Sequence, residues 1–231
     1  MTLFPATENL NLANFTRGKS ILVFDLDGVL VDSVEVKTQA FYKIYCQYGE
    51  NIAQRVVDHH RANGGMSRYD KFSYYHKEFL NQEITQEQLD DLAEKFSKIV
   101  VEKVIKADEI AGARQFLEKV CYHGFRCAIN SATPQKELDP ILSQRNILHH
   151  FEWVYGSPAS KSQNLYTLLK ETNLDHGQLV FFGDAKADYN AAKEVGIMFI
   201  GVGDFMKEYF SKQNYHEFVI NDFLEIVQYV K

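Results

Sequence analysis

Residues 21–33, ILVFDLDGVLVDS, establish the architecture of this chain because a predicted buried strand ends there in two carboxylates. The apolar run at 21–24, which contains β-branched residues, predicts a strand inside a parallel sheet. Asp25 and Asp27 follow it, and Gly28 can take the positive φ of a tight turn. Ligands of open α/β sheets bind beyond the carboxyl ends of the strands. A divalent cation such as Mg²⁺ would offset the repulsion between the two carboxylates, whereas the alternative is a solvated acidic turn.

Composition limits the kinds of partner that the chain can have. Its 231 residues suffice for one or two domains, and 45% hydrophobic residues are enough for a sizeable core. The net charge of −6 argues against nucleic acid or an anionic membrane as the main partner. No apolar stretch approaches the roughly 20 residues of a membrane span, and the N-terminal residues lack the pattern of a secretory signal. We therefore expect a cytoplasmic protein, with Cys121 and Cys127 as core thiols.

A long helical segment follows the first predicted strand. Apolar residues recur at helical spacing after Ser33, and Thr85 with Gln88 forms a capping-box pattern before a helix expected at 86–104. No strand pattern interrupts residues 34–106, which are too many for an ordinary connection between a strand and a helix. We therefore expect a helical domain at 34–106, inserted into an α/β core domain made of residues 1–33 and 107–231.

Strands and helices alternate in the second half of the chain. Strands are expected at 125–130, 151–155, 179–182, 197–202 and 218–220, and a helix is expected at the C-terminus. This alternation predicts an α/β fold with a doubly wound, Rossmann-like parallel sheet.

Polar side chains follow successive predicted strands, and the carboxyl ends of parallel strands share one edge of a sheet. We therefore expect these side chains to converge around one site. Phosphoryl transfer needs an in-line nucleophile, neutralised charge on the phosphoryl oxygens and an acid for the leaving group. A carboxylate can be that nucleophile, and a lysine with a helix N-terminus can hold the oxygens. The converging residues are Asp25, Asp27, Ser131, Lys161, Asp184 and Asp188.

These positions resemble the four motifs of the haloacid dehalogenase (HAD) superfamily, specifically its phosphoglycolate-phosphatase-like branch, over nearly the whole chain. The resemblance implies that Asp25 is the nucleophile. It implies that Asp27 is the general acid/base and gives its backbone carbonyl to Mg²⁺. Asp184 and Asp188 match the GDxxxD form of the fourth motif and would complete the metal site with Asp25 and Asp27.

The same resemblance assigns the phosphate contacts and the inserted helices. Ser131 and the backbone N–H of Ala132 would hold the phosphoryl group, and Lys161 would steady charge on nucleophile and phosphate. The helices at 34–106 match the family's cap, which closes over the site and selects the substrate. The implied activity is Mg²⁺-dependent hydrolysis of a small phosphorylated metabolite, such as a phospho-acid or a sugar phosphate. The sequence leaves open whether the protein is a monomer or a homodimer.

A glycine pair at 64–65 lies within the helical segment, flanked by cationic residues. It predicts a flexible loop from which Arg61, Arg68 and Lys71 could reach an anionic part of the substrate. The other interpretation is a turn between helices with solvated charges. As residues of amphipathic helices, Lys37, Lys43 and Lys71 are expected to be ordinary surface lysines and not the Schiff-base lysine of a phosphonate hydrolase.

Other activities of the same superfamily require different residues at the site. Dehalogenases lack the second Asp of the DxD motif, so the presence of Asp27 favours phosphoryl transfer. Phosphonate hydrolysis would need a cap lysine that forms a Schiff base. A sugar-phosphate mutase keeps both Asp residues and stays open as an alternative, as does a non-enzymatic scaffold that uses its cap for protein contacts.

Overall fold

A computed structural model of the chain describes residues 15–213 and 218–230. Within these residues, six strands form one sheet in the order β3-β2-β1-β4-β5-β6, and every neighbouring pair is parallel. The strands are β1 (Ile21–Phe24), β2 (Arg126–Pro134), β3 (Trp153–Ser157), β4 (Leu179–Gly183), β5 (Met198–Val202) and β6 (Phe218–Ile220). The predicted parallel α/β sheet is confirmed.

Helices cover both faces of this sheet because the central strand β1 is apolar on both sides. Leu22 and Phe24 pack in a core with α5 and α6, while Ile21 and Val23 pack on the other face with α7, α8 and α9. Such two-sided burial is why β1 is an unbroken apolar run. These helices are α5 (Ala113–Tyr122), α6 (Gln135–Gln144), α7 (Lys161–Thr172), α8 (Lys186–Val195) and α9 (Gly203–Gln213).

The strand order reverses direction beside β1. Phe24 is aligned with Ile129 of β2 on one side and with Phe182 of β4 on the other, and the chain extends outward from β1 in both directions. The carboxyl ends of β1 and β4 therefore form the switch point at which doubly wound sheets bind ligands.

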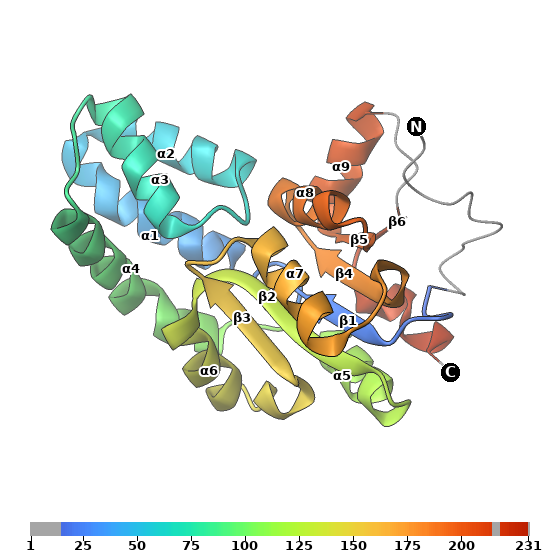
Figure 1. Cartoon of the computed structure of the whole chain (residues 1–231). Coiled ribbons are helices and arrows are strands. Elements are labelled where there is room, and N and C mark those ends of the chain that lie inside the picture. Colours follow the sequence, from blue (N-terminus) through green and yellow to red (C-terminus); the bar gives the residue numbers. More distant parts are fainter. Residues whose placement is uncertain (1–14, 214–217, 231) are drawn as a thin grey trace.

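The segment 34–106 is helical throughout its regular parts and contributes no strand to the sheet. Figure 1 shows α1, α2 and α3 beyond the carboxyl ends of β2 and β3, with α4 leading back to the core. The predicted capping box of Thr85 and Gln88 is confirmed at the start of α4. The helices are α1 (Val34–Tyr45), α2 (Glu50–Ala62), α3 (Arg68–Tyr74) and α4 (Gln86–Lys106), and a π-helical turn (Tyr75–Phe79) continues α3.

Arg145, which follows α6, fastens the end of α4 to the core. Its guanidinium donates to the backbone carbonyls of Val104, Ile105 and Ala107 at 2.8, 2.9 and 2.7 Å. These carbonyls lie at the helix C-terminus, where the i+4 hydrogen bonds of the helix interior end, and Val104 also accepts from the Ala107 N–H. The guanidinium therefore satisfies their hydrogen-bonding capacity and interacts favourably with the helix dipole.

Two expectations about the C-terminal part of the chain are corrected. The predicted C-terminal helix is wrong, because Phe223–Glu225 and Val227–Tyr229 form short 3-10 turns whose residues Phe223 and Ile226 are buried against the core. Helix α9 was not expected.

The N-terminal residues that were expected to lack a secretory signal lie mostly outside the described part. Among the described helices, none combines the length and the apolar character needed to cross a bilayer.

Candidate functional site

Asp25 occupies the switch point of the sheet as the first residue beyond β1. Its backbone N–H still donates to the carbonyl of Phe182 at 3.0 Å, so the sheet ladder fixes its main chain. One carboxylate oxygen accepts from the Leu26 N–H at 2.7 Å, and the other accepts from the Lys161 ammonium at 2.6 Å. The side chain is buried. Asp25 is therefore held by the backbone on one side and by a cation on the other.

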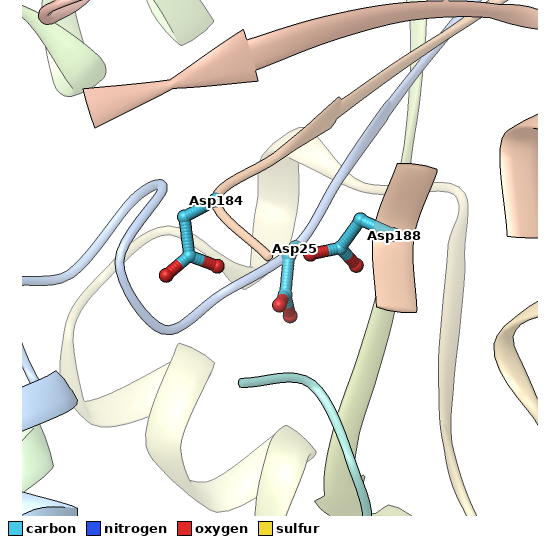
Figure 2. Close-up of side chains that lie close together, drawn as sticks. All are labelled: Asp25, Asp184 and Asp188. Carbon is cyan, nitrogen blue, oxygen red and sulfur yellow. The ribbon is translucent and has the colours of Figure 1, made fainter. Parts of the chain in front are cut away.

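Three carboxylates meet at this point. Asp25, Asp184 and Asp188 each offer an oxygen atom, and these atoms lie within 4.8 Å of one another. Figure 2 shows them approaching from β1, from the end of β4 and from α8. Two glycines make the approach possible: a Cβ on Gly28 would lie 2.2 Å from Asp184 Oδ2, and one on Gly183 would lie 2.2 Å from the Asp188 Cβ.

The electrostatics of this cluster favour a cation. Burial, followed by the charges of Asp188 and Asp25, raises the pKa of Asp184 well above its ordinary value. Burial likewise raises the pKa of Asp188 to about 7, although Lys161 acts in the opposite direction. Three carboxylates therefore share one ammonium, which contacts the buried Asp25 and Asp188, while Asp184 is half-buried. Oxygen donors in such a set fit a hard divalent ion such as Mg²⁺, which binds through carboxylates.

Lys161 is held rigidly as the first residue of α7. Its ammonium contacts Asp25 and also Asp188, and burial, which alone would lower its pKa, is outweighed by these two charges, which raise it. The amide of Asn130 on β2 donates to the Lys161 backbone carbonyl at 3.0 Å and accepts from Asn164 at 3.0 Å. Sequence reasoning missed both asparagines. A polar residue inside the apolar run of β2 was the available signal for Asn130.

Residues 131–133 belong to β2, which runs four residues beyond the predicted strand end. Ser131 is buried, and its hydroxyl accepts from the Thr133 N–H at 3.1 Å. Ala132 lines the same cavity as Asp25. Thr133, which was not predicted as a site residue, donates from its hydroxyl to Asp27 at 3.1 Å.

The Asp27 carboxylate is not a member of the three-carboxylate cluster and is surrounded by donors. Ser33 donates to one oxygen at 2.6 Å, and Thr133 and Lys37 contact the other. Burial alone would raise the pKa of Asp27, but the charge of Lys37 and the hydrogen bonds from all three donors lower it below its ordinary value. Lys37 is thus not the solvated surface lysine that was expected.

A cavity of about 280 Å³ opens over the cluster and lies between the core and the inserted helices. Its wall includes the glycine pair 64–65, and a Cβ on Gly65 would lie 2.8 Å from the Ala187 Cβ and 3.7 Å from Lys161 Nζ. The predicted loop therefore lies against the polar residues at the strand ends. The charged residues that line the cavity are Asp25, Asp27, Lys37, Arg61, Arg68, Lys71 and Asp184.

The cationic residues predicted around the glycine pair have different surroundings. Arg61 is exposed and pairs with Glu35. Arg68 is buried and forms a two-pronged ion pair with Glu137 of α6, at 2.9 and 2.8 Å. Lys71, expected at the surface under one interpretation, is only 2% exposed. The turn is therefore not simply a solvated one, since two of its three cations are buried at the cavity wall.

Lys71 differs from the other buried cations of this cavity in its partner. Its ammonium lies 2.7 Å from His60 Nδ1, and in the described part of the chain it forms no ion pair. Burial, then the charge of Lys37, lowers the pKa of Lys71 to about 7. Burial, then the charge of Lys71, lowers the pKa of His60 to about 2, so the imidazole is a neutral acceptor. A buried ammonium without a carboxylate is a ready partner for an anion.

Comparison with known proteins gives this geometry a context. The family model of haloacid dehalogenase-like hydrolases matches residues 22–202. A phosphoglycolate phosphatase of Pseudomonas putida is 26% identical over 193 residues, which cover 79% of this chain and 68% of that protein. A phosphoglycolate phosphatase of Mannheimia succiniciproducens is 26% identical over 189 residues, covering 79% of this chain and 84% of that protein. The chain thus spans about two thirds of the Pseudomonas relative's length.

Solved structures share the fold. A predicted phosphoglycolate phosphatase from Haemophilus somnus superposes with a TM-score of 0.72 at 18% identity, covering 93% of this chain and 99% of that one. At this identity the likeness concerns the fold, including the inserted helices, and leaves the chemistry to be argued from the residues.

Proposed function

Because the chain belongs to the haloacid dehalogenase-like hydrolase family, we propose that it is a Mg²⁺-dependent phosphatase of a small phosphorylated metabolite. The observation that carries the proposal is the position of Asp25. Its carboxylate contacts Lys161, lies within 4.8 Å of oxygen atoms of Asp184 and Asp188, and lines the cavity. The phosphatase names of the sequence relatives support the same activity.

We infer that Asp25 attacks phosphorus. A new bond forms between an Asp25 oxygen and phosphorus, the ester P–O bond breaks, and the leaving alkoxide takes a proton from Asp27. Water then attacks the aspartyl-phosphate with Asp27 as base, which releases inorganic phosphate and restores the Asp25 carboxylate. Lys161, Ser131 and the Ala132 N–H would hold the phosphoryl oxygens.

The metal would be held by the side chains of Asp25 and Asp184 and the backbone carbonyl of Asp27, with Asp188 supporting the site. When bound, Mg²⁺ supplies positive charge that lets an anionic nucleophile approach an anionic phosphate. In this scheme residues 1–33 and 107–231 are the core domain that carries the chemistry. Residues 34–106 are the cap domain that covers the cavity and selects the substrate.

A panel of phosphorylated metabolites tests this function. We expect release of inorganic phosphate in the presence of Mg²⁺, loss of release with excess chelator, and recovery when Mg²⁺ is restored. The Asp25→Asn variant, purified in parallel, controls for a contaminating phosphatase. Isomerised sugar phosphates without phosphate release would instead indicate a mutase, and a panel with no turnover would indicate a non-enzymatic scaffold.

The substrate class follows from Lys71. A phosphoryl group at Asp25 leaves the remainder of the molecule in the cavity. There the Lys71 ammonium contacts a neutral imidazole and lies over the Phe41 ring, but it pairs with no carboxylate of the described residues. We therefore propose a phospho-acid, whose carboxylate binds Lys71. Arg68 was proposed for the same task. Arg68 stays a proposed substrate contact at the cavity wall, but its guanidinium already forms an ion pair with Glu137.

The Lys71→Met variant keeps the length of the side chain and removes its charge. We expect KM for the phospho-acid to rise about 10- to 100-fold, the scale of one charge-assisted hydrogen bond. The KM for 4-nitrophenyl phosphate, which has no carboxylate, should not change. Lys77→Met, a change at an exposed lysine on the following turn, is the matched control.

The pH dependence of KM for the phospho-acid is a second test of the role of Lys71. Because its pKa lies at about 7 in the free protein, the ammonium is charged below that pH and loses its charge above it. The KM for the phospho-acid should therefore rise with pH above 7, relative to the KM for 4-nitrophenyl phosphate. The Lys71→Met variant should not show this relative rise. An equal pH profile for both proteins would contradict the assignment.

A further inference from the structure

Lys37 joins the inserted helices to the residue proposed as the acid/base. It lies on α1, the first helix of the insertion, and its side chain is 16% exposed. The ammonium contacts an oxygen of Asp27 and donates to the Thr133 hydroxyl at 3.0 Å. It is the only charged donor on Asp27 among the described residues.

The three donors leave Asp27 little freedom to rotate. The Thr133 hydroxyl accepts from Lys37 and donates its single proton to Asp27, which closes a triangle of hydrogen bonds. Ser33 holds the second carboxylate oxygen. Ser33 and Thr133 are attached to the core, whereas Lys37 comes from the insertion. The orientation of Asp27 therefore depends on where α1 lies.

Lys37 and Lys161 serve different sides of the site. Lys161 contacts Asp25 and Asp188, at the position of the phosphoryl group. Lys37 lines the cavity wall beside Asp27, on the side from which the leaving group would depart.

We infer that Lys37 is a positioning residue that aims the Asp27 carboxyl at the leaving oxygen of the ester. The inference rests on the proposed phosphatase function. It assigns to the insertion a part in the chemical step in addition to substrate selection. Loss of Lys37 should therefore matter most for a substrate whose leaving oxygen needs a proton.

The test compares two leaving groups by kcat/KM, which reports phosphoryl transfer to Asp25 and not the later hydrolysis of the aspartyl-phosphate. One substrate is 4-nitrophenyl phosphate, whose phenolate leaves without much help. The other is the alkyl phosphate that the wild-type enzyme hydrolyses best in the panel. For Lys37→Met, we expect kcat/KM to fall about 10²-fold for the alkyl phosphate and less than about fivefold for the aryl phosphate, because Asp27 is no longer aimed at the leaving oxygen. If Lys37 acted only through its charge, which lowers the pKa of Asp27, the variant would hold more Asp27 as the protonated acid, and kcat/KM for the alkyl phosphate would rise instead.

Two further variants complete the experiment. Lys37→Arg keeps a cation beside Asp27 and should restore part of the loss on the alkyl phosphate. Lys43→Met, a change at an exposed lysine of the same helix, should leave kcat/KM unchanged for both substrates. If kcat/KM of Lys37→Met falls equally for both substrates, or falls for neither, the inference is overturned. Absence of any turnover by the wild-type protein would overturn the proposed phosphatase function, and this inference with it.

Discussion

Replacing Asp25 with asparagine should abolish phosphate release while leaving the fold intact. Asparagine has nearly the same shape but no charge, so it cannot attack phosphorus or form an acyl phosphate. We expect kcat to fall by at least about 10⁴-fold, a scale typical of the loss of a catalytic nucleophile. The measurement is phosphate release in Mg²⁺ with the best substrate of the panel.

The fold should tolerate this change because the cluster carries like charges. Asp184 and Asp188 remain, and Lys161 keeps its contact with Asp188. Removing one of three neighbouring carboxylates lowers their mutual repulsion, so the thermal midpoint without metal should not fall. Asp32→Asn, an exposed change in the same segment, is the matched control and should keep full activity.

A second readout concerns the covalent intermediate. Acid-quenched wild-type protein should show an added phosphoryl group by intact mass during turnover, and the Asp25→Asn variant should not. Substantial activity in the variant would show that another residue is the nucleophile. A mass shift in the variant would lead to the same conclusion.

The Glu137→Gln substitution should have the largest effect on stability. The Arg68 guanidinium is 5% exposed and Glu137 is 7% exposed, and their ion pair joins α3 of the insertion to α6 of the core. Ser97 of α4 also donates to Glu137, at 2.6 Å. Removing one partner leaves a buried charge without compensation, which costs about 3–5 kcal/mol of the free energy of unfolding.

Urea unfolding followed by circular dichroism measures this change, provided that the m-value is the same for both proteins. Glu94→Gln is the control, because Glu94 pairs with Lys98 on the exposed face of α4. Its free energy of unfolding should stay close to that of the unaltered protein, because an exposed ion pair contributes little. Replacing Arg68 and Glu137 together by methionine should recover part of the loss, since no charge is then left alone. If Glu137→Gln changes the free energy of unfolding no more than Glu94→Gln does, the Arg68–Glu137 pair is not important for stability.

Local sequence patterns were enough to predict the sheet and the residues along its edge. The apolar run before Asp25 and the run before Asp184 are local patterns, and parallel strands bring their carboxyl ends together whatever the rest of the chain does. The helical character of residues 34–106 was equally legible, because a period of 3.6 residues and a capping box are properties of neighbouring residues.

Which cations of the inserted helices are buried, and which residues they contact, depends on the packing of elements that are distant in the sequence. A lysine in an amphipathic helix has the same local pattern whether it faces water or a cavity, so nothing near Lys37 marked it. The glycine pair indicated Lys71 as one of three cations that could reach the substrate, but it did not show which of the three are buried. The Arg68–Glu137 pair joins residues 69 positions apart, and the C-terminal turns at Phe223 and Ile226 follow the shape of the core. Such contacts depend on how separate elements pack, and the energy of burial that selects them is absent from any short stretch of sequence.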